Sequence, residues 1–201
     1  MKFKNKYFLL RHGESSVNLN GLVSCWPEKI YSPLTGKGVR QIEEAAKKLK
    51  NERIDFIFSS DILRTKQTAE IVGRKLGIKP RFDKRLRDVN LGIFNGKLIN
   101  EAGKFWVPGG KKLSPLAYYK RRFTITPPKG ENYLAIEKRL LGFLKDMEKK
   151  YQGKNILIVS HKRPFTLLEK MVFGWSIKKF IENIVQNKEM KNGELRKLWL
   201  S

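Results

Sequence analysis

The chain has 201 residues, the size of one ordinary domain. Hydrophobic residues make up 40% of it and aromatic residues 11%, which is enough for a packed core and excludes a disordered chain. With 43 Lys and Arg against 19 Asp and Glu, the formal net charge is +24, so the candidate partners are nucleic acid, an anionic membrane surface or a phosphorylated substrate.

Two further features concern the location of the protein. Cys25 is the single cysteine, which excludes an intramolecular disulfide framework and suits a reducing cytoplasm. The first apolar run, residues 7–10, stops at Arg11. A signal peptide needs an apolar stretch of about 7–15 residues, and a membrane helix needs about 20. We therefore expect a cytoplasmic protein without a membrane-spanning segment.

The first half of the chain predicts strands and helices in alternation. Residues 7–10 are a short apolar run typical of a buried strand. Thr35 is a candidate N-cap of a helix that continues to about residue 49, with apolar residues at helical spacing. A second strand is predicted at residues 54–58, and Asp61 is a candidate cap of a second helix, which ends at Gly77.

The second half resumes this alternation after an interruption. Residues 97–130 are rich in Pro, Gly, aromatic residues and cations, which favours a lid-like insertion over a site rather than a core element. A helix is predicted at about 131–151, a strand at 156–159, one or two shorter helices, and an edge strand at 194–200. This order predicts a single α/β domain over residues 1–201, with a mostly parallel sheet covered on both faces.

The two histidines, His12 and His161, each follow directly after a predicted strand. In open α/β sheets, ligands bind beyond the carboxyl ends of the strands. Arg11 precedes His12, and Arg64 lies near the start of the helix after the second strand. Two imidazoles and two guanidinium groups without a metal-type carboxylate cluster indicate an anion pocket, most naturally for a phosphoryl group. Gly13 is expected to let the backbone turn sharply there.

Five segments resemble, in order, the motifs of the histidine phosphatase superfamily, the phosphoglycerate-mutase-like enzymes. They extend from near the start of the chain to about residue 175: RHGESSVN at 11–18, PLT at 33–35 with a glycine at 38, SSDILRTKQTA at 59–69, LRDVNLG at 86–92 and ILIVSH at 156–161. The resemblance implies a three-layer α/β/α sandwich, in agreement with the sheet expected above.

Carried over position by position, the resemblance implies that His12 is the nucleophile and forms a phosphohistidine. It must attack as the neutral imidazole, so its other ring nitrogen should donate to a fixed acceptor. Asp88 lies where the family places its general acid, which protonates the leaving oxygen and then deprotonates water. No metal is implied. Four side chains would hold the phosphoryl group: Arg11, Asn18, Arg64 and His161.

Two positions depart from the family pattern. Many members have Glu where this chain has Asp88, and a cationic pocket opposes the protonated form that a general acid needs. Glu14 is the nearest alternative carboxylate, although a structural role is favoured for it. After His161, many relatives have small residues, often Gly, whereas here Lys162 and Arg163 follow. These cations either extend the anion site outward or face solvent.

The resemblance extends to two branches of the family. Residues 18–26 are similar to a loop of the cofactor-dependent phosphoglycerate mutases, which would place Ser24 and Cys25 beside a substrate carboxylate. Arg121 and Arg122 resemble the paired arginines that bind that carboxylate in the mutases.

The segment Gly-Glu-Asn at 130–132 follows Pro127 and Pro128 after one residue, Lys129, and this short connection and the total length resemble the smaller phosphatases. We therefore expect a phosphomonoester hydrolase that acts on a small anionic phosphorylated substrate and needs no cofactor. The alternative is a phosphoglycerate mutase, for which 2,3-bisphosphoglycerate would be the cofactor.

A catalytically weak nucleic-acid-binding protein on the same scaffold is the alternative from another class. The cations are spread almost evenly over the two halves of the chain, and no nucleic-acid recognition motif accompanies them. We expect nucleic acid to bind only non-specifically through charge. The oligomeric state is not fixed by the sequence.

Overall fold

The computed structural model describes residues 3–198, and within them one sheet has the strand order β3-β2-β4-β1-β5. Its strands are β1 (Lys6–Arg11), β2 (Phe56–Ser59), β3 (Arg81–Phe82), β4 (Asn155–Ser160) and β5 (Leu195–Lys197). β1, β2, β3 and β4 are parallel, and β5 pairs antiparallel with β1 at the edge. The predicted strands are confirmed, although residues 199–200 of the last one lie outside the described residues. β3 is too short to leave a pattern in the sequence.

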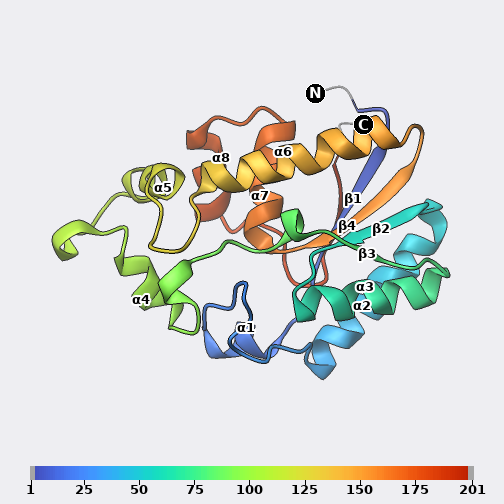
Figure 1. Cartoon of the computed structure of the whole chain (residues 1–201), viewed down its shortest axis with the longest axis horizontal. Coiled ribbons are helices and arrows are strands. Elements are labelled where there is room, and N and C mark those ends of the chain that lie inside the picture. Colours follow the sequence, from blue (N-terminus) through green and yellow to red (C-terminus); the bar gives the residue numbers. More distant parts are fainter. Residues whose placement is uncertain (1–2, 199–201) are drawn as a thin grey trace.

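The helices form layers on the two faces of this sheet (Figure 1). On one face lie α2 (Gly36–Leu49) and α3 (Leu63–Leu76), and on the other lie α6 (Tyr133–Lys150), α7 (Lys162–Val172) and α8 (Ile177–Val185). The three-layer α/β/α sandwich is therefore confirmed. The short helices α1 (Ser16–Asn20), α4 (Ile99–Lys104) and α5 (Pro115–Thr124) lie to the side of these layers (Figure 1). None of the helices between residues 3 and 198 is long and apolar enough to cross a membrane.

The sheet has a hydrophobic core on each face, because successive side chains of a strand point to opposite faces. In β1, Tyr7 and Leu9 pack with α6, α7 and α8, whereas Phe8 and Leu10 pack with α2 and α3. A strand that is apolar throughout therefore needs a helical layer on each side. All four of these residues are at most 1% exposed. Each such side chain contributes about 1.5–3 kcal/mol through removal of apolar surface from water.

The predicted helix starts were right at one position and wrong at another. Thr35 caps α2, since its side chain accepts a hydrogen bond from the Gly38 N–H. Asp61 does not cap α3, which begins at Leu63 after Ile62. The Asp61 carboxylate is instead bound by the Arg87 guanidinium, with Nε 2.6 Å from Oδ1. A carboxylate distant in sequence, Glu28, accepts from the Leu63 N–H at 3.0 Å, so tertiary contacts replaced the local cap.

Gly13 is needed for a different reason from the one predicted. It is not among the described residues with positive φ, so no sharp left-handed turn requires it. A Cβ atom on Gly13 would lie 2.4 Å from the carbonyl oxygen of Gly38, and a Cβ on Gly38 would lie 2.0 Å from the carbonyl oxygen of Glu14. The two glycines let the start of α2 pack backbone to backbone against the loop that carries His12.

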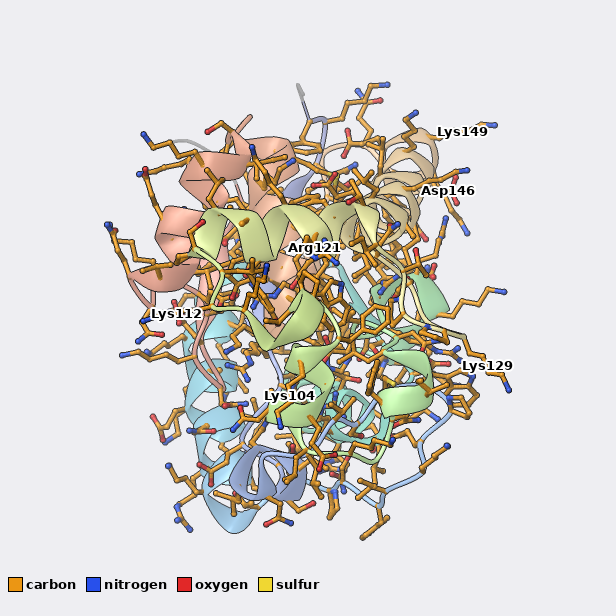
Figure 2. The ribbon with its side chains drawn as sticks, turned by 90° about the vertical axis from the view of Figure 1, so that its left-hand side faces the viewer. Lys104, Lys112, Arg121, Lys129, Asp146 and Lys149 are labelled. Atoms are coloured by element: carbon orange, nitrogen blue, oxygen red, sulfur yellow. The ribbon has the colours of Figure 1, made fainter. Side chains whose placement is uncertain are left out.

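Residues 97–130 contain α4 and α5, which Figure 2 shows in front of the rest of the molecule. Trp106 and Phe123 are buried, and Phe123 joins the core formed with α6 and α8. The aromatic residues of this segment thus anchor it to the domain, while its lysines at 111, 112, 120 and 129 stay exposed. Its role as a lid remains a prediction.

Candidate active site

The pairing of β1 with β4 brings the two histidines together. Arg11 lies opposite Ser160 in the parallel register, so the residues that follow, His12 and His161, leave the sheet side by side. Their ring centroids are 5.2 Å apart. β2 is the other neighbour of β4, and Ser60, directly after β2, places its Oγ 3.1 Å from His161 Nε2. Three strand ends therefore meet at one point, as expected for adjacent parallel strands.

His12 is held in one tautomer with one ring nitrogen available. Its Nδ1 lies 2.8 Å from the Gly13 carbonyl oxygen, which can only accept, so Nδ1 carries the proton and Nε2 carries the lone pair. This carbonyl is the fixed acceptor expected from the sequence. Burial, followed by the charge of Arg64, lowers the pKa of His12 well below its ordinary value. The imidazole is therefore neutral near pH 7, as a nucleophile requires.

Arg64, in the first turn of α3, connects the groups of the site. Its Nε donates to His12 Nε2 at 3.3 Å, and its Nη2 contacts His161 Nδ1 at 3.2 Å and Asp88 Oδ2 at 3.3 Å. Ser24 fixes the guanidinium by accepting from it with both its hydroxyl and its carbonyl oxygen. The residue is 2% exposed. A rigid, permanently charged fork in this position is suited to binding a planar set of phosphoryl oxygens.

His161 is neutral as well. Burial is the main cause that lowers its pKa well below the ordinary value, with Arg64 and Arg11 adding to it. Because Arg64 can only donate, His161 Nδ1 accepts, and the proton lies on Nε2, which donates to Ser60. The His161 Nδ1 atom is also 3.6 Å from Asp88 Oδ2. A proton added at Nδ1 would therefore be shared with that carboxylate.

Asp88 reaches the site from a loop that is fixed by an ion pair behind it. Arg139 donates to the Asp88 carbonyl oxygen at 3.2 Å and pairs with Glu131 at 2.8 Å. Glu131 in turn accepts from the Asn90 N–H at 2.9 Å. The Asp88 side chain retains 29% exposure, in contrast to the buried histidines. The carboxylate can thus contact both a substrate and solvent water.

Arg11 and Asn18 complete the inner part of the site. Arg11 Nη1 donates to the Met190 carbonyl oxygen at 2.8 Å, while its buried Nε has no hydrogen-bond partner among the described residues. The Asn18 carboxamide oxygen accepts from the Ser15 N–H and hydroxyl, both at 3.0 Å. Its amide nitrogen is therefore the atom with which Asn18 can donate to a ligand.

Arg11, His12, Asn18, Arg64 and Asp88 line a cavity of about 500 Å³, a size typical of small-molecule sites. Arg122, Lys162 and Arg163 also line it, together with the apolar residues Leu22 and Ile99. The sequence left open whether Lys162 and Arg163 face solvent or the site. In the structure both border the cavity that contains His12.

The model of the histidine phosphatase superfamily, branch 1, matches residues 7–195. The chain belongs to this superfamily. Its members are phosphatases and mutases that carry out phosphoryl transfer, so the chain is an enzyme of the same kind.

Among curated relatives, a probable phosphoglycerate mutase, GpmB, of Escherichia fergusonii is 30% identical over 173 residues, covering 83% of this chain and 74% of the relative. Among solved structures, a mycobacterial glucosyl-3-phosphoglycerate phosphatase has a TM-score of 0.78 at 21% identity, covering 96% of this chain and 92% of that one. A putative α-ribazole-5′-phosphate phosphatase of Escherichia coli has a TM-score of 0.75 at 20% identity, covering 96% and 89%. The structural likeness shows the common fold.

Four residues considered from the sequence do not line the cavity: Glu14, Cys25, Arg121 and His161. His161 is fully buried and contacts the site through Arg64. Cys25 is 1% exposed, its thiol lies 3.6 Å from Asn90 Oδ1, and burial raises its pKa. Arg121 lies in the last turn of α5 (Figure 2). Its buried Nε has no hydrogen-bond partner among the described residues. Glu14 pairs with Lys37 at 2.9 Å and accepts from the Thr35 hydroxyl. Its contacts are those of a structural residue.

Two residues around the cavity were missed from the sequence. Asn192 lines it and donates to the His12 carbonyl oxygen at 3.1 Å and to Asn18 Oδ1 at 3.3 Å. Glu189 lies behind Lys162 and Arg163 and is bound by the Thr166 hydroxyl. Both residues come from the loop before β5, which has no sequence motif. The loop lies at the site only because β5 pairs antiparallel with β1.

The charge at this site comes from guanidinium and ammonium groups. In the described part of the chain, no three His, Cys, Asp or Glu side chains form a cluster that could hold a metal ion. The donors that converge beside His12 are Arg11, Arg64 and Asn18. Such donors compensate phosphoryl charge directly, which is the main requirement of this chemistry.

Proposed function

We propose that this protein is a phosphomonoester hydrolase that acts through a phosphohistidine at His12 and needs neither metal nor cofactor. The observation that carries the proposal is the neutral His12 ring. Its Nδ1 is fixed to the Gly13 carbonyl, and its Nε2 lies in the cavity against Arg64. The lone pair is thus held where a phosphorus atom would be bound between Arg11 and Arg64.

In the first step, His12 Nε2 forms a bond to phosphorus while the bond between phosphorus and the ester oxygen breaks. Asp88, in its acid form, gives its proton to that leaving oxygen. Arg11, Arg64 and Asn18 hold the phosphoryl oxygens. Neutral His161 has no free N–H for these oxygens, because its Nε2 donates to Ser60, and its Nδ1 instead accepts from Arg64 and helps to position that guanidinium. In the second step, the Asp88 carboxylate takes a proton from water, whose oxygen attacks phosphorus and releases His12 and inorganic phosphate.

Access of water favours hydrolysis over transfer between substrates. The proposed acid and base, Asp88, keeps 29% of its side chain exposed, so water can reach the position from which the phosphohistidine is attacked. The substrate class proposed is a small anionic phosphate ester, because the cavity is about 500 Å³ and bordered by five cations among the described residues.

The His12 role is tested by turnover of p-nitrophenyl phosphate by wild type and His12→Asn, with and without a chelator. We expect a loss of about 10³-fold or more in kcat in the variant and no effect of the chelator. Brief reaction with ³²P-labelled substrate should label wild-type protein only, with the acid-labile, alkali-stable behaviour of a phosphoramidate. Persistent turnover by a folded His12→Asn protein would refute the proposal, and loss of activity with the chelator would indicate a metal-assisted reaction.

Phosphoglycerate mutase activity is the second candidate. Ser24 and Arg122, which resemble carboxylate-binding residues of the mutases, both line the cavity. The assay is interconversion of 3- and 2-phosphoglycerate with and without 2,3-bisphosphoglycerate. Interconversion faster than phosphate release would favour the mutase.

The proposed location and wider partners rest on composition. The single cysteine supports a reducing, cytoplasmic environment. Exposed lysines such as Lys104, Lys129 and Lys149 come from different elements (Figure 2). We expect their attraction for nucleic acid to be non-specific and to weaken as salt is added.

A further inference from the structure

The outer part of the cavity contains a second group of cations, which we call the outer cluster: Arg122, Lys162 and Arg163. Arg122 comes from the last turn of α5, and the other two come from the first turn of α7. The centroid of the Tyr133 ring lies 5.0 Å from the Arg122 guanidinium and 5.7 Å from that of Arg163. Both arginines therefore contact the same aromatic ring.

The outer cluster has more positive charge than the protein neutralises. Glu189, 7% exposed, faces two of its cations: Arg163 Nη1 at 2.7 Å and Lys162 Nζ at 3.8 Å. One carboxylate thus serves two positive groups, and the shorter contact is the one to Arg163. Lys162 is left weakly paired, with a side chain that is 46% exposed.

Arg122 has no ion-pair partner in the described part of the chain. Its guanidinium lies 4.1 Å from the Trp106 ring centroid and donates to the Tyr118 hydroxyl at 3.3 Å, while its buried Nε has no partner. Aromatic faces hold a guanidinium in place without neutralising it. The fork is therefore oriented before any ligand binds, which lowers the entropic cost of binding an anion.

The charge of the whole cavity supports the same interpretation. Five cations border it among the described residues, and the carboxylates of Asp88 and Glu189 offset two of them. A phosphoryl dianion between Arg11 and Arg64 would leave one positive charge uncompensated, and two when Asp88 carries its proton. Burying like charges without counterions is unfavourable. A substrate with a single phosphoryl group would therefore leave positive charge in the cavity that a second anionic group could neutralise.

We propose that Lys162, together with Arg122, binds a second anionic group of the substrate. The substrate class is then a small phosphate ester with an additional carboxylate or phosphate, joined by a short carbon skeleton that packs against Leu22 and Ile99. Lys162 is then a specificity-determining residue for that second group. This inference rests on the proposed hydrolase activity at His12.

The experiment compares matched pairs of phosphate esters that differ in one anionic group. 3-Phosphoglycerate is paired with glycerol 3-phosphate, and propane-1,3-diol bisphosphate with propyl phosphate. Phosphate release gives kcat/KM for each in wild type, Lys162→Gln and Lys179→Gln. Lys179, on α8, is exposed and does not line the cavity, so its substitution removes the same charge elsewhere.

We expect wild type to prefer the doubly anionic member of at least one pair. Lys162→Gln should reduce that preference about 3- to 10-fold, a modest effect because the ammonium group is partly solvated. Lys179→Gln should retain it. The pair that responds identifies the second group as carboxylate or phosphate. Equal efficiency within both pairs, or the same preference in Lys162→Gln and Lys179→Gln, would overturn the assignment. Absence of any His12-dependent phosphate release would instead overturn the proposed hydrolase.

Discussion

The two ends of one cavity are built in different ways. At the inner end, strand pairing fixes His12 and His161, and Arg64 has a hydrogen-bond partner at each guanidinium nitrogen. At the outer end, Arg122 is held by aromatic rings and Lys162 by a carboxylate that it shares. The inner end derives from the sheet, and the outer end derives from α5 and the start of α7. The difference suggests that the inner end provides chemistry and the outer end selects the substrate.

The strongest test of this difference removes one guanidinium from each end. We expect Arg64→Gln to lower kcat/KM for p-nitrophenyl phosphate about 10³-fold, because a buried donor of the transition state is lost. Arg122→Gln should lower it about 10-fold or less, because this substrate has no second anion. Steady-state kinetics measures both values, and Arg64→Lys provides a charged variant that disturbs the fold less. Equal losses at the two ends would contradict the division of roles.

A second prediction concerns Asp88, which lies between the two ends. Asp88→Asn should slow hydrolysis of alkyl phosphates about 10²- to 10³-fold and that of p-nitrophenyl phosphate much less, because a good leaving group needs no proton. The measurement is kcat/KM across a series of leaving groups, which reports the step in which the leaving group departs and not the later hydrolysis of the phosphohistidine. Asp88→Glu, which introduces the residue common in the family, should keep a leaving-group dependence like that of wild type. The same loss for every ester in Asp88→Asn would refute the general-acid role.

The smallest effect predicted is on stability and tests how completely the inner end is desolvated. The folded-state pKa values of His12 and His161 are lowered by burial, so the unfolded chain binds more protons as the pH falls through its own histidine pKa of about 6.5. Each histidine should therefore lower the free energy of unfolding by about 0.8 kcal/mol between pH 7.5 and pH 6, or about 1.6 kcal/mol together. Glu169, whose pKa burial raises, acts in the opposite direction at lower pH.

Urea denaturation at several pH values measures this slope. His12→Asn and His161→Asn should each remove about half of it. A slope that is unchanged in both variants would show that the two imidazoles are not the groups that titrate.

Much of the fold could be predicted from local patterns. Continuous apolar runs predicted β1, β2 and β4, because a strand buried on both faces has no polar alternation. The cap at Thr35 was predicted because its hydroxyl bonds within its own turn. The cap at Asp61 was wrong because Arg87, 26 residues away, binds that carboxylate.

Some residues of the site could be predicted from local sequence patterns and others could not. Arg11, His12 and His161 were found because each lies at the end of a strand, a position that a sequence displays directly. Asn192 and Glu189 were not found, because they lie in a loop without periodicity or motif. Cys25 and Arg121 were predicted as site residues because the segments around them resemble those of the mutases. The direction in which a side chain points depends on tertiary packing, which the surrounding sequence does not show.

The sequence by itself determined which strands form, which residues follow them and the excess of positive charge. The order of the strands, and hence the meeting of His12 with His161, depends on tertiary pairing between segments about 150 residues apart. The same holds for the charge. Composition counts cations, but only the folded chain decides which carboxylates neutralise them. The folded chain leaves Lys162 and Arg122 beside the cavity with too few counterions, because Arg122 packs against aromatic rings and Lys162 shares the Glu189 carboxylate with Arg163.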